Sequence, residues 1–371
     1  MKKINVAVVG AKGAVGHEII RVLENRKFPV GEFRPFGSAR SAGHEVLFQG
    51  KKYSNQELKF QPGEFKGIDL VLSSPGASVS KQFVPHAIKD GALIIDNTSA
   101  FRMDPKVPLV VPEINPEDIS KHQGIIANPN CSAIMMLMAA APLHKKNRIR
   151  RILCATYQAV SGAGATAMVE LYLQTQEFVK RVEGNPLRKT DLLASIEQEM
   201  LHLQKKPLIQ DPKVFPHPIA FNLFSHNAAI EQDGYNGEEL KMIQESRKIL
   251  HDDTLKIVTT CIRVPVLRAH TEVLYLEFEK PMSPEEAREI LRQTPGIDIQ
   301  DDSKANHFPM PLEASNRENV LVGRIRKDLS CENGLSLMVA GDQLWKGAAL
   351  NAVQIAEMAF KTTDHRPQTT D

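Results

Sequence analysis

The chain has 371 residues, of which 42% are hydrophobic and 24% are charged, a balance typical of a folded globular protein. This length exceeds that of one ordinary core and predicts two domains. The formal net charge of +2 gives no general attraction to nucleic acid or to a membrane surface, although a local cluster for small anions remains open. Four scattered cysteines without paired spacing predict neither a disulfide framework nor a metal site, and they fit a reducing compartment.

The chain begins with a short apolar run, Ile4 to Val9, that follows Met1-Lys2-Lys3. The run stops at Gly10 and leads into a glycine loop, so it predicts a first β-strand rather than the core of a signal peptide. The apolar stretch from Ile134 to Ala141 is far shorter than a membrane span and predicts a core helix. We therefore expect a soluble, cytoplasmic protein that binds neither membranes nor nucleic acid.

Apolar strands and amphipathic helices alternate through the first part of the chain. Strands are predicted at 4–9, near 33–36, at 70–73 and at 93–96, with helices at 13–26 and near 79–89. Uninterrupted apolar strands between amphipathic helices are typical of a parallel sheet covered on both faces. The sequence therefore predicts an N-terminal doubly wound (Rossmann-type) α/β domain.

The pattern changes in the second part of the chain, where the strands become longer and more alternating. Strands are predicted at 151–159, 254–266, 271–279 and 319–328, and long helical stretches at 167–182 and 189–204. Fewer crossover units predict a second, α+β domain with an antiparallel or mixed sheet and helices on one side. A closing helix at 347–360 is expected to pack back on the first domain, and the polar segment 361–371 to fray.

A glycine loop connects the first strand to the first helix. Glycines in such a loop let the backbone approach a pyrophosphate, and the N-terminus of the following helix faces that group. A tight strand-to-helix turn without a ligand also uses glycines, so the loop alone leaves that alternative open. Its place directly after an apolar strand at the start of the chain favours a dinucleotide site, with contacts at Gly10, Lys12, Gly13, Ala14 and Val15.

The loop after the second strand contains an arginine between two serines. An NAD-selective fold usually offers an acidic residue at this point for the ribose hydroxyls. Arg40, flanked by Ser38 and Ser41, instead suits a 2′-phosphate. The competing interpretation is a solvated loop arginine. The sequence predicts NADP(H) rather than NAD as the cofactor.

The segment Asn128-Pro129-Asn130-Cys131-Ser132 places a single cysteine at a turn just before an apolar helix. The unpaired backbone N–H groups and the positive end of the helix dipole favour a thiolate there. Asparagine and proline are turn formers and are unexpected around an anonymous core cysteine. Cys131 is therefore predicted to be a nucleophile, whereas Cys154 and Cys261, which lie in strand-like segments, are interpreted as small core residues.

With these segments the chain resembles the aspartate-semialdehyde dehydrogenase family over nearly its whole length and in the family's order. The cysteine, glutamine and histidine motifs together are specific. The segments that carry the resemblance are the glycine loop, Asn97-Thr98-Ser99-Ala100-Phe101-Arg102, Asn128-Pro129-Asn130-Cys131, Gln158-Ala159-Val160-Ser161-Gly162-Ala163-Gly164, Arg263-Val264-Pro265-Val266 with the following His270, and Gly341-Asp342-Gln343.

The resemblance implies an NADP-dependent interconversion of L-aspartyl 4-phosphate and L-aspartate 4-semialdehyde, with release of inorganic phosphate, through an acyl-thioester on Cys131. It places the reaction in lysine, threonine, methionine and diaminopimelate biosynthesis. It also implies a homodimer with one site in each subunit. Residues 1–130 plus 342–371 would form the dinucleotide-binding domain, and residues 131–341 the catalytic, substrate-binding and dimerisation domain.

The resemblance also assigns roles to single residues. Cys131 is the nucleophile, His270 is the acid/base group, and Gln158 orients the substrate or donates to an oxyanion. Arg263 matches the carboxylate-binding arginine of the family, and Glu238 a position that holds the substrate ammonium group or Lys241. The remaining matches are Arg102, Lys241 and Asn130 for phosphate, and Ser161, Gly162 and Gln343 for the cofactor; no metal is implied.

The chain departs from the family pattern at a few positions. Lys12 stands where threonine is common, Gln343 where many relatives have asparagine, and Phe224 to Asn227 differs from the expected sequence before the helix that carries Glu238. Two alternatives remain open at this point. One is N-acetyl-glutamyl-phosphate reductase, which performs the same chemistry on a longer, acylated substrate, and the other is a non-catalytic relative with the same fold.

Overall fold

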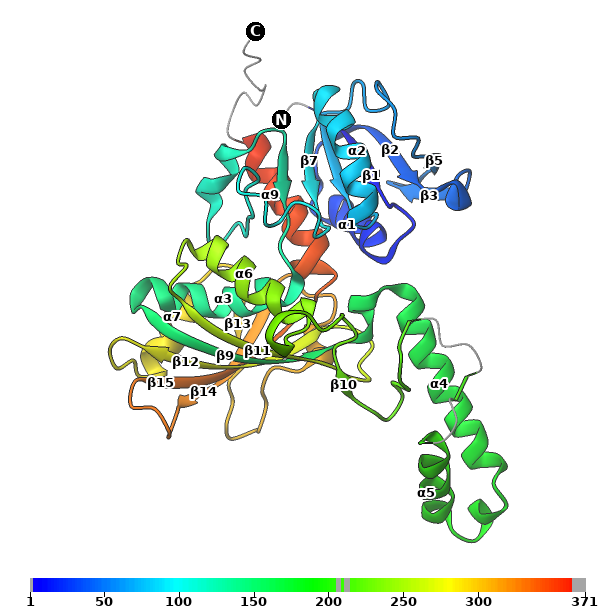
Figure 1. Ribbon diagram of the computed structural model, residues 1–371, viewed down its shortest axis with the longest axis vertical. Helices are drawn as coiled ribbons and strands as arrows, with labels where there is room; N and C mark the ends of the chain where they lie inside the picture. The colour runs from blue at the N-terminus through cyan, green and yellow to red at the C-terminus, as the bar shows by residue number, and fades with distance from the viewer. Residues whose placement is uncertain (1–2, 205–207, 210–213, 362–371) are drawn as a thin grey trace.

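The computed structural model describes residues 3–204, 208–209 and 214–361. Two sheets, each with its own helices, make up the body of the molecule, and a helical arm extends away from it (Figure 1). The tail expected to fray was residues 361–371; Lys361 is the last residue of a helix, and residues 362–371 lie outside the described residues. No helix in the described ranges is long and apolar enough to cross a membrane.

The first sheet is parallel throughout. Within the described part of the chain it holds six strands in the order β5-β2-β1-β6-β7-β8, so the order reverses between β1 and β6. A small hairpin follows β2, and its strands are β3 (Glu45–Phe48) and β4 (Lys51–Ser54). The strands of the sheet are β1 (Ile4–Val9), β2 (Val30–Gly37), β5 (Gln56–Glu57), β6 (Leu70–Ser73), β7 (Leu93–Asp96) and β8 (Ile125–Ala127).

Helices cover both faces of this sheet, because successive side chains of a strand point to opposite sides. Ala7 and Val9 of β1 pack in the cluster that includes α2 (Ala77–Lys89). Val6 and Val8 pack in the other cluster, with α1 (Ala14–Asn25) and α9 (Leu350–Lys361). The doubly wound domain is confirmed, and so is the return of the closing helix to it.

The second sheet is mixed, as predicted. It contains seven strands among the residues described, in the order β10-β11-β9-β12-β15-β14-β13. β9 and β11 are parallel, as are β13 and β14, and the other pairs are antiparallel. The strands are β9 (Ile149–Gln158), β10 (Phe224–Ser225), β11 (Lys256–Arg263), β12 (His270–Phe278), β13 (Ile297–Ile299), β14 (Val320–Lys327) and β15 (Gly334–Gly341).

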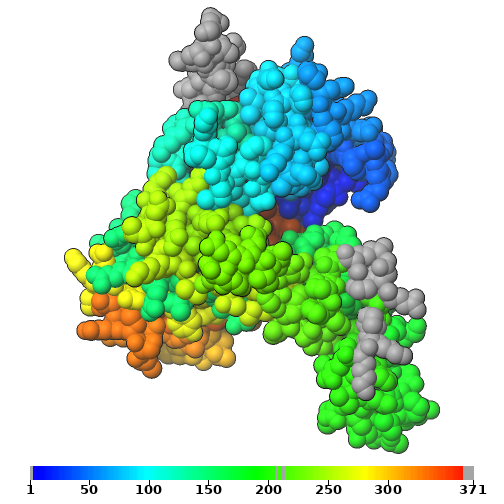
Figure 2. Space-filling model, viewed as in Figure 1, coloured from blue at the N-terminus to red at the C-terminus, as the bar shows by residue number. Residues whose placement is uncertain are grey.

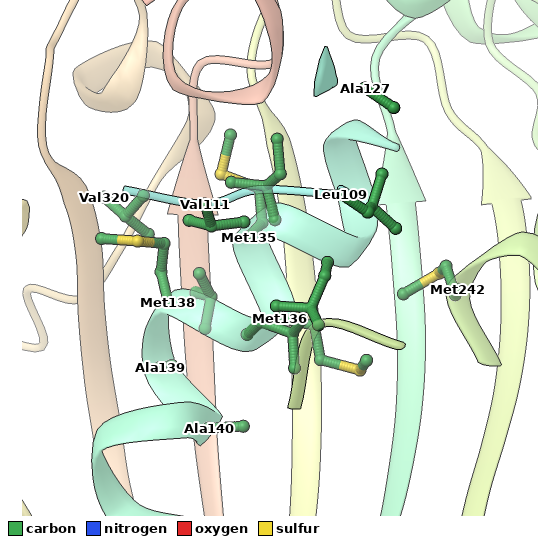
Figure 3. Packing of buried hydrophobic residues seen from close by; sticks show 14 of the residues in the cluster. Leu109, Val111, Ala127, Met135, Met136, Met138, Ala139, Ala140, Met242 and Val320 are labelled. Atoms are coloured by element: carbon green, nitrogen blue, oxygen red, sulfur yellow. The ribbon is translucent and has the colours of Figure 1, made fainter. Parts of the chain in front are cut away.

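One face of the second sheet is covered by three helices, α3 (Cys131–Lys146), α6 (Gly237–Leu250) and α7 (Pro284–Arg292) (Figure 1). α3 is apolar nearly all round, which is typical of a buried helix. Its methionines and alanines pack between the first domain and the second sheet, as the close view of Met135, Met136 and Met138 shows (Figure 3). This helix therefore belongs to the core of both halves.

Several predicted boundaries shift. The helix predicted from residue 189 begins as α5 (Leu192–Leu203), because the Asp191 side chain caps it by accepting the Ala194 N–H. The strand predicted to reach residue 266 ends with β11 at Arg263. The helix predicted at 347–360 is a π-helical turn, Trp345–Ala349, followed by α9. The short strands β3, β4, β5, β8, β10 and β13 were not predicted, and neither was the longer β15.

The arm consists of α4 (Ala165–Gly184) and α5, which project beyond the sheets (Figure 1). It has a small core of its own that includes Leu171, Phe178 and Val182 of α4. A single short turn, α8 (Pro311–Ala314), lies against β15.

Candidate active site

A cavity of about 490 Å³ lies where the strand ends of both sheets meet. The carboxyl ends of β6 and β7 contribute Ser74 and Asn97, and the carboxyl ends of β9 and β11 contribute Gln158 and Arg263. In an open parallel sheet ligands bind at this edge, next to the point where the strand order reverses. The space-filling view shows the N-terminal part of the chain meeting the middle part along this recess, with the C-terminal part visible at its floor (Figure 2).

Cys131 is the first residue of α3 and faces the cavity. The preceding Asn130 caps the helix, because its Oδ1 accepts the backbone N–H groups of Ser132 at 3.0 Å and Ala133 at 3.1 Å. On the opposite side Gly347 approaches so closely that a Cβ there would lie 2.7 Å from the Cβ of Cys131. The turn predicted from the sequence therefore places the sulfur in the cavity wall.

The expected lowering of the thiol pKa is wrong for the free protein. Burial is the largest influence on Cys131 and, together with the nearby carboxylate of Glu238, it raises the pKa of the thiol to about 12. Arg102 and Arg263 act in the opposite direction and are outweighed. The helix N-terminus alone does not decide the ionisation of this cysteine, so the free protein carries a thiol.

His270, the first residue of β12, is completely buried and lies beside the thiol. Its Nε2 is 3.6 Å from the Cys131 Sγ, and its Nδ1 accepts the backbone N–H of Ala159 at 3.0 Å. Because Nδ1 is an acceptor, the proton of the neutral ring is on Nε2 and points to the sulfur. Burial, assisted by Arg263, lowers the pKa of His270 to about 3, so the ring is neutral.

Gln158 is the last residue of β9, and two neighbouring hydroxyl groups hold its side-chain amide in place. Nε2 donates to Ser132 Oγ at 3.1 Å and to Thr156 Oγ1 at 3.3 Å, so both of its N–H groups are engaged. Ser132 also bonds to Glu272, a fully buried carboxyl group on β12 whose pKa burial raises well above its usual range. In this arrangement Gln158 has only its side-chain oxygen free, and no N–H donor. It can therefore orient the substrate, but it has no N–H left to donate to an oxyanion.

Arg263 is directly opposite Gln158 in the parallel ladder of β9 and β11. Its Nη1 donates to the Ala159 carbonyl oxygen at 2.7 Å, while its buried Nε has no partner among the described residues. Only 2% of the arginine is exposed, and burial lowers the pKa of its guanidinium. Such a buried cation with an unused donor is suited to an anionic ligand.

Glu238 lies in the first turn of α6 and is buried. Its Oε1 accepts from Asn130 Nδ2 at 2.7 Å, and its Oε2 is 3.6 Å from Lys241 Nζ. Although burial opposes ionisation, the His226 ring, which becomes protonated only below its own pKa of about 4, and the Lys241 ammonium lower the pKa of Glu238 to about 2. The carboxylate is therefore charged at neutral pH, and it holds Lys241 at the cavity wall.

Arg102 also lines the cavity, and it is anchored on three sides. Nε and Nη2 donate to the backbone oxygens of Asn128 and Asn97 at 2.9 and 2.8 Å, and Nη1 pairs with Glu245 at 3.1 Å. Glu245 also accepts the backbone N–H of Asn130 at 2.6 Å. Three of the five N–H donors of this guanidinium are used by the protein, which leaves two for a ligand.

The nucleotide end of the cavity is formed by the start of α1. Gly13 is the N-cap of the helix, and its own N–H donates to the Gly10 carbonyl oxygen at 2.9 Å. It provides no side-chain cap, which leaves the N–H groups of Ala14 and Val15 uncapped where these residues line the cavity. Gly10 has a φ of +85°, and a Cβ at Gly16 would lie 2.1 Å from the Gly10 carbonyl oxygen. This compact turn with unpaired N–H groups fits a pyrophosphate.

The cofactor residues predicted in the later part of the chain also lie in the cavity wall. Ser161, Gly162 and Gln343 all line it, and Gln343 Nε2 donates to the hydroxyl of Ser161. Gln343 Oε1 accepts the backbone N–H of Ala269 at 2.9 Å. A Cβ at Gly162 would lie 3.0 Å from the His270 ring, so the glycine allows this close approach.

Five of the predicted cofactor residues do not line this cavity. Gly10 forms the turn before α1, Ser38, Arg40 and Ser41 belong to the turn after β2, and the Lys12 ammonium group donates to the Glu45 carbonyl oxygen at 3.2 Å. All five are in the first domain, in or near the glycine loop rather than beside Cys131.

Sequence reasoning missed several residues of the cavity wall. Ser74 and Asn97 directly follow parallel strands, and that position was a usable signal. The other missed lining residues are Ser99, Ala163, Gly164, His226, Asn227, Leu344, Gly347 and Ala348.

Among the described residues no group of three or more His, Cys, Asp or Glu side chains is arranged to hold a metal ion.

The two halves of the chain match two family models. Residues 5–122 match the semialdehyde dehydrogenase NAD binding domain, and residues 140–346 match the semialdehyde dehydrogenase dimerisation domain. The order of these two matches is the order of the two sheets described above.

Relatives that align with this chain over nearly their whole length are named aspartate-semialdehyde dehydrogenase. An aspartate-semialdehyde dehydrogenase of Aquifex aeolicus (strain VF5) is 48% identical over 96% of this chain and 98% of its own length. An aspartate-semialdehyde dehydrogenase of Bacillus subtilis (strain 168) is 43% identical over 96% of this chain and 98% of its own length. The crystal structure of aspartate semialdehyde dehydrogenase II from Vibrio cholerae, complexed with ASA, superimposes with a TM-score of 0.88 at 37% identity and covers 98% of this chain and 100% of that one. The chain therefore belongs to the aspartate-semialdehyde dehydrogenase family of oxidoreductases.

Proposed function

We propose that the chain catalyses the reversible, phosphate-dependent oxidation of L-aspartate 4-semialdehyde to L-aspartyl 4-phosphate with NADP. The observation that carries this proposal is the single cavity that holds Cys131, 3.6 Å from His270, together with Arg263, Arg102 and Lys241. A nucleophile among cationic groups suits a substrate that has a carboxylate at one end and reacts with phosphate at the other. In the cell the reverse direction, toward the semialdehyde, would serve amino-acid biosynthesis.

The chemistry assigned to Cys131 is covalent. Its sulfur adds to the aldehyde carbon: the S–H bond breaks as the C–S bond forms, and the carbonyl oxygen takes up the thiol proton. Loss of hydride from that carbon, for which the oxidised nicotinamide would be the acceptor, and loss of the hydroxyl proton to solvent give a thioester. An oxygen of hydrogen phosphate then attacks the thioester carbon, the C–S bond breaks, the acyl phosphate leaves, and the phosphate proton returns to the sulfur of Cys131.

His270 serves this sequence as a donor. Its Nε2–H points to the sulfur because Nδ1 is occupied by the Ala159 N–H. From that position the ring hydrogen-bonds the sulfur and the developing oxygen of the hemithioacetal. Gln158 orients the substrate with its free oxygen, since Ser132 and Thr156 hold its amide nitrogen.

Arg263 binds the substrate carboxylate, and Glu238 binds the substrate ammonium group. Arg102 and Lys241 bind phosphate, next to Asn130. The two spare donors of Arg102 and the Lys241 ammonium support this assignment. N-acetyl-glutamyl-phosphate reductase is not favoured as an alternative, because the relatives carry the aspartate-semialdehyde dehydrogenase name.

Residues 1–130 plus 342–371 are proposed to form the dinucleotide-binding domain, and residues 131–341 the catalytic domain. The uncapped N–H groups of Ala14 and Val15, next to Gly13, would hold the pyrophosphate, and Ser161, Gly162 and Gln343 the nicotinamide end. When bound, the oxidised nicotinamide supplies the hydride acceptor.

The preference for NADP is assigned to Arg40 with Ser38 and Ser41. The turn after β2 exposes the arginine next to two hydroxyl groups, a set of donors suited to a 2′-phosphate. Replacement Arg40→Ala is expected to lower the ratio of kcat/KM for NADP to that for NAD by about tenfold or more. An unchanged ratio would remove Arg40 from the cofactor site.

We assign the oligomer of this family member to a homodimer formed through the second sheet. The face opposite α3, α6 and α7 carries exposed apolar side chains on three adjacent strands, among them Leu153, Val258 and Tyr275. Leu153 pairs with both of the others across the strands, so these side chains form one patch. Leu153→Asp is expected to produce monomers in sedimentation equilibrium, whereas Leu47→Asp, at an exposed position of β3, leaves the dimer intact.

The proposed activity is tested by NADPH formation from aspartate semialdehyde, NADP and phosphate. Activity must require both phosphate and Cys131, so omission of phosphate and the variant Cys131→Ala should each abolish it. Folded wild-type protein that forms no NADPH, or a Cys131→Ala variant of normal activity, would contradict the proposal.

A further inference from the structure

His226 was not among the residues predicted for the site, although the backbone fixes it beside Arg263. Phe224 and Ser225 form β10, which pairs antiparallel with the end of β11, so that Phe224 is opposite Arg263. The next residue continues this pairing, because the His226 N–H donates to the Cys261 carbonyl oxygen at 2.9 Å. The imidazole lies in the cavity wall, next to the guanidinium.

The hydrogen bonds of the His226 ring leave one acceptor missing. Nδ1 accepts the backbone N–H of Ala228 at 3.1 Å, so the proton of the neutral ring is on Nε2. Nε2 is 2.7 Å from Arg263 Nη2, a guanidinium nitrogen that can donate a hydrogen bond but cannot accept one. The N–H groups of His226 Nε2 and Arg263 Nη2 therefore face each other with no acceptor between them. The other tautomer only moves the conflict to Ala228, since a proton on Nδ1 would then face that N–H.

The neighbours of Arg263 do not supply the missing acceptor. Its Nη1 is used by the Ala159 carbonyl oxygen, and Nη2 has a contact of 3.4 Å with Asn227 Oδ1, long for a hydrogen bond. The carboxylate of Glu238, the charge that most favours the guanidinium, is bound to Asn130 and Lys241. Burial lowers the pKa of His226 to about 4, so the ring is neutral and a donor at physiological pH.

We propose that His226 is a second binding residue for the substrate carboxylate: its Nε2–H and the guanidinium of Arg263 converge on the same anionic oxygens. This inference rests on the proposed function and extends it from Arg263 to a residue of the β10 turn. A carboxylate between the two side chains accepts from both and removes the donor conflict of the free protein. It also gives the buried arginine a counter-ion.

The same arrangement defines substrate selectivity. A ligand without this carboxylate makes no hydrogen bonds to His226 and Arg263. The N–H groups of these two residues then still face each other without an acceptor. A site built around a polar group of its ligand rejects analogues that lack that group. His226 should therefore distinguish aspartate semialdehyde from 3-aminopropanal, which is the same aldehyde without the carboxylate.

The test measures steady-state kinetics of wild-type protein, His226→Ala and His226→Gln with both aldehydes. His226→Ala is expected to raise KM for aspartate semialdehyde about tenfold, with kcat changed less than about threefold, and to leave kcat/KM for 3-aminopropanal nearly unchanged. His226→Gln keeps an N–H donor of similar reach, so it should restore most of the affinity. His217→Ala, at an exposed residue near Phe224 but outside the cavity, is the matched control and should behave as wild type.

The outcomes separate the two proposals. Equal losses for both aldehydes would show that His226 shapes the pocket rather than binding the carboxylate, and unchanged kinetics would show that it does neither; both results overturn the inference. Wild-type protein that is inactive with aspartate semialdehyde would instead overturn the proposed function, on which this inference depends.

Discussion

The sulfur of Cys131 lies among groups of both charges, and their balance sets how readily it ionises. Arg102 and Arg263 favour the thiolate, whereas burial and the carboxylate of Glu238 oppose it and prevail. A thiol of this kind is protected until ligands change its surroundings, because only the thiolate is strongly nucleophilic. The cationic groups to which we assign substrate and phosphate therefore also affect the ionisation of Cys131.

The raised pKa of Cys131 predicts the pH dependence of its alkylation in the free protein. Below a pKa of about 12 the thiolate fraction rises about tenfold for each unit of pH. The rate of reaction with iodoacetamide, followed by mass spectrometry of the Cys131 peptide, should thus still be rising at pH 9. A rate that levels off near neutral pH would show a lowered pKa and contradict the balance described above.

Glu238→Gln isolates the electrostatic part of this effect. The amide oxygen of glutamine can still accept from Asn130, but the negative charge near the sulfur is lost. Alkylation of Cys131 at pH 8 should become about threefold faster or more, while Cys331, the other partly exposed cysteine, reacts as before.

For single residues, the sequence predicted the turn that places Cys131 in the cavity wall, but not the direction in which the pKa of its thiol shifts. Asparagine and proline around Cys131 gave the turn, and turn chemistry is local. The direction of the pKa shift depends on Glu238, which another helix brings to the site, and on burial by the second domain. Likewise, nothing local to Ser225-His226 shows that the imidazole faces Arg263.

Among the elements, strand ends and helix starts assemble the cavity. Gln158 and Arg263 are adjacent because β9 and β11 are parallel and end together, and His270 begins the antiparallel neighbour β12. Cys131 starts α3, while the π-helical turn Trp345–Ala349 closes the cavity from the C-terminal side. Each side chain is thus held by a regular element, which supports a precise geometry.

Gly347 in this π-helical turn is predicted to be essential for the position of the nucleophile. An added Cβ would lie 2.7 Å from the Cβ and 3.3 Å from the Cα of Cys131, so one of the two backbones must move. Gly347→Ala should lower kcat about tenfold or more and reduce the free energy of unfolding by about 1–3 kcal/mol. Steady-state kinetics and urea unfolding measure the two effects.

Gly184→Ala provides the matched control, because nothing lies within 4 Å of a Cβ at that position, the last residue of α4. It should leave both kcat and the free energy of unfolding close to those of wild type. If Gly347→Ala were equally silent, the contact between the turn and Cys131 would not constrain the site.

The elements themselves were partly predictable. Long periodic segments such as α4 and the strands β1, β2, β6 and β7 of the parallel sheet follow local patterns, whereas β15 does not. Its sequence, Gly334–Gly341, contains glycine, serine and alanine, and Val339 is its single β-branched residue. It is buried on both faces between β12 and β14, so a pattern of buried and exposed positions does not mark it as a strand. Its identity as a strand comes from its partners.

In the whole molecule, the junction of the two domains buries ionisable groups in their neutral forms. His270 is fully buried and neutral, with a pKa of about 3, and α3 joins the two cores around it. Burying a neutral imidazole links the stability of the fold to pH, because the unfolded chain can take up a proton that the folded chain excludes. The active site therefore contributes to the acid sensitivity of the entire protein.

The sign of this linkage follows from the two pKa values of His270. An unfolded histidine titrates near 6.5 and the folded one near 3, so the unfolded state binds more protons between these values and stability falls as the pH is lowered through this range. Between pH 7 and pH 5 this histidine alone should cost about 2 kcal/mol of the free energy of unfolding. Urea unfolding at pH 7, 6 and 5 should show wild type losing about that much more than His270→Gln, which has no such group to titrate. His217→Gln, at an exposed position, should lose stability in parallel with wild type, and a His270→Gln variant that also did so would mean that the imidazole is protonated in the fold.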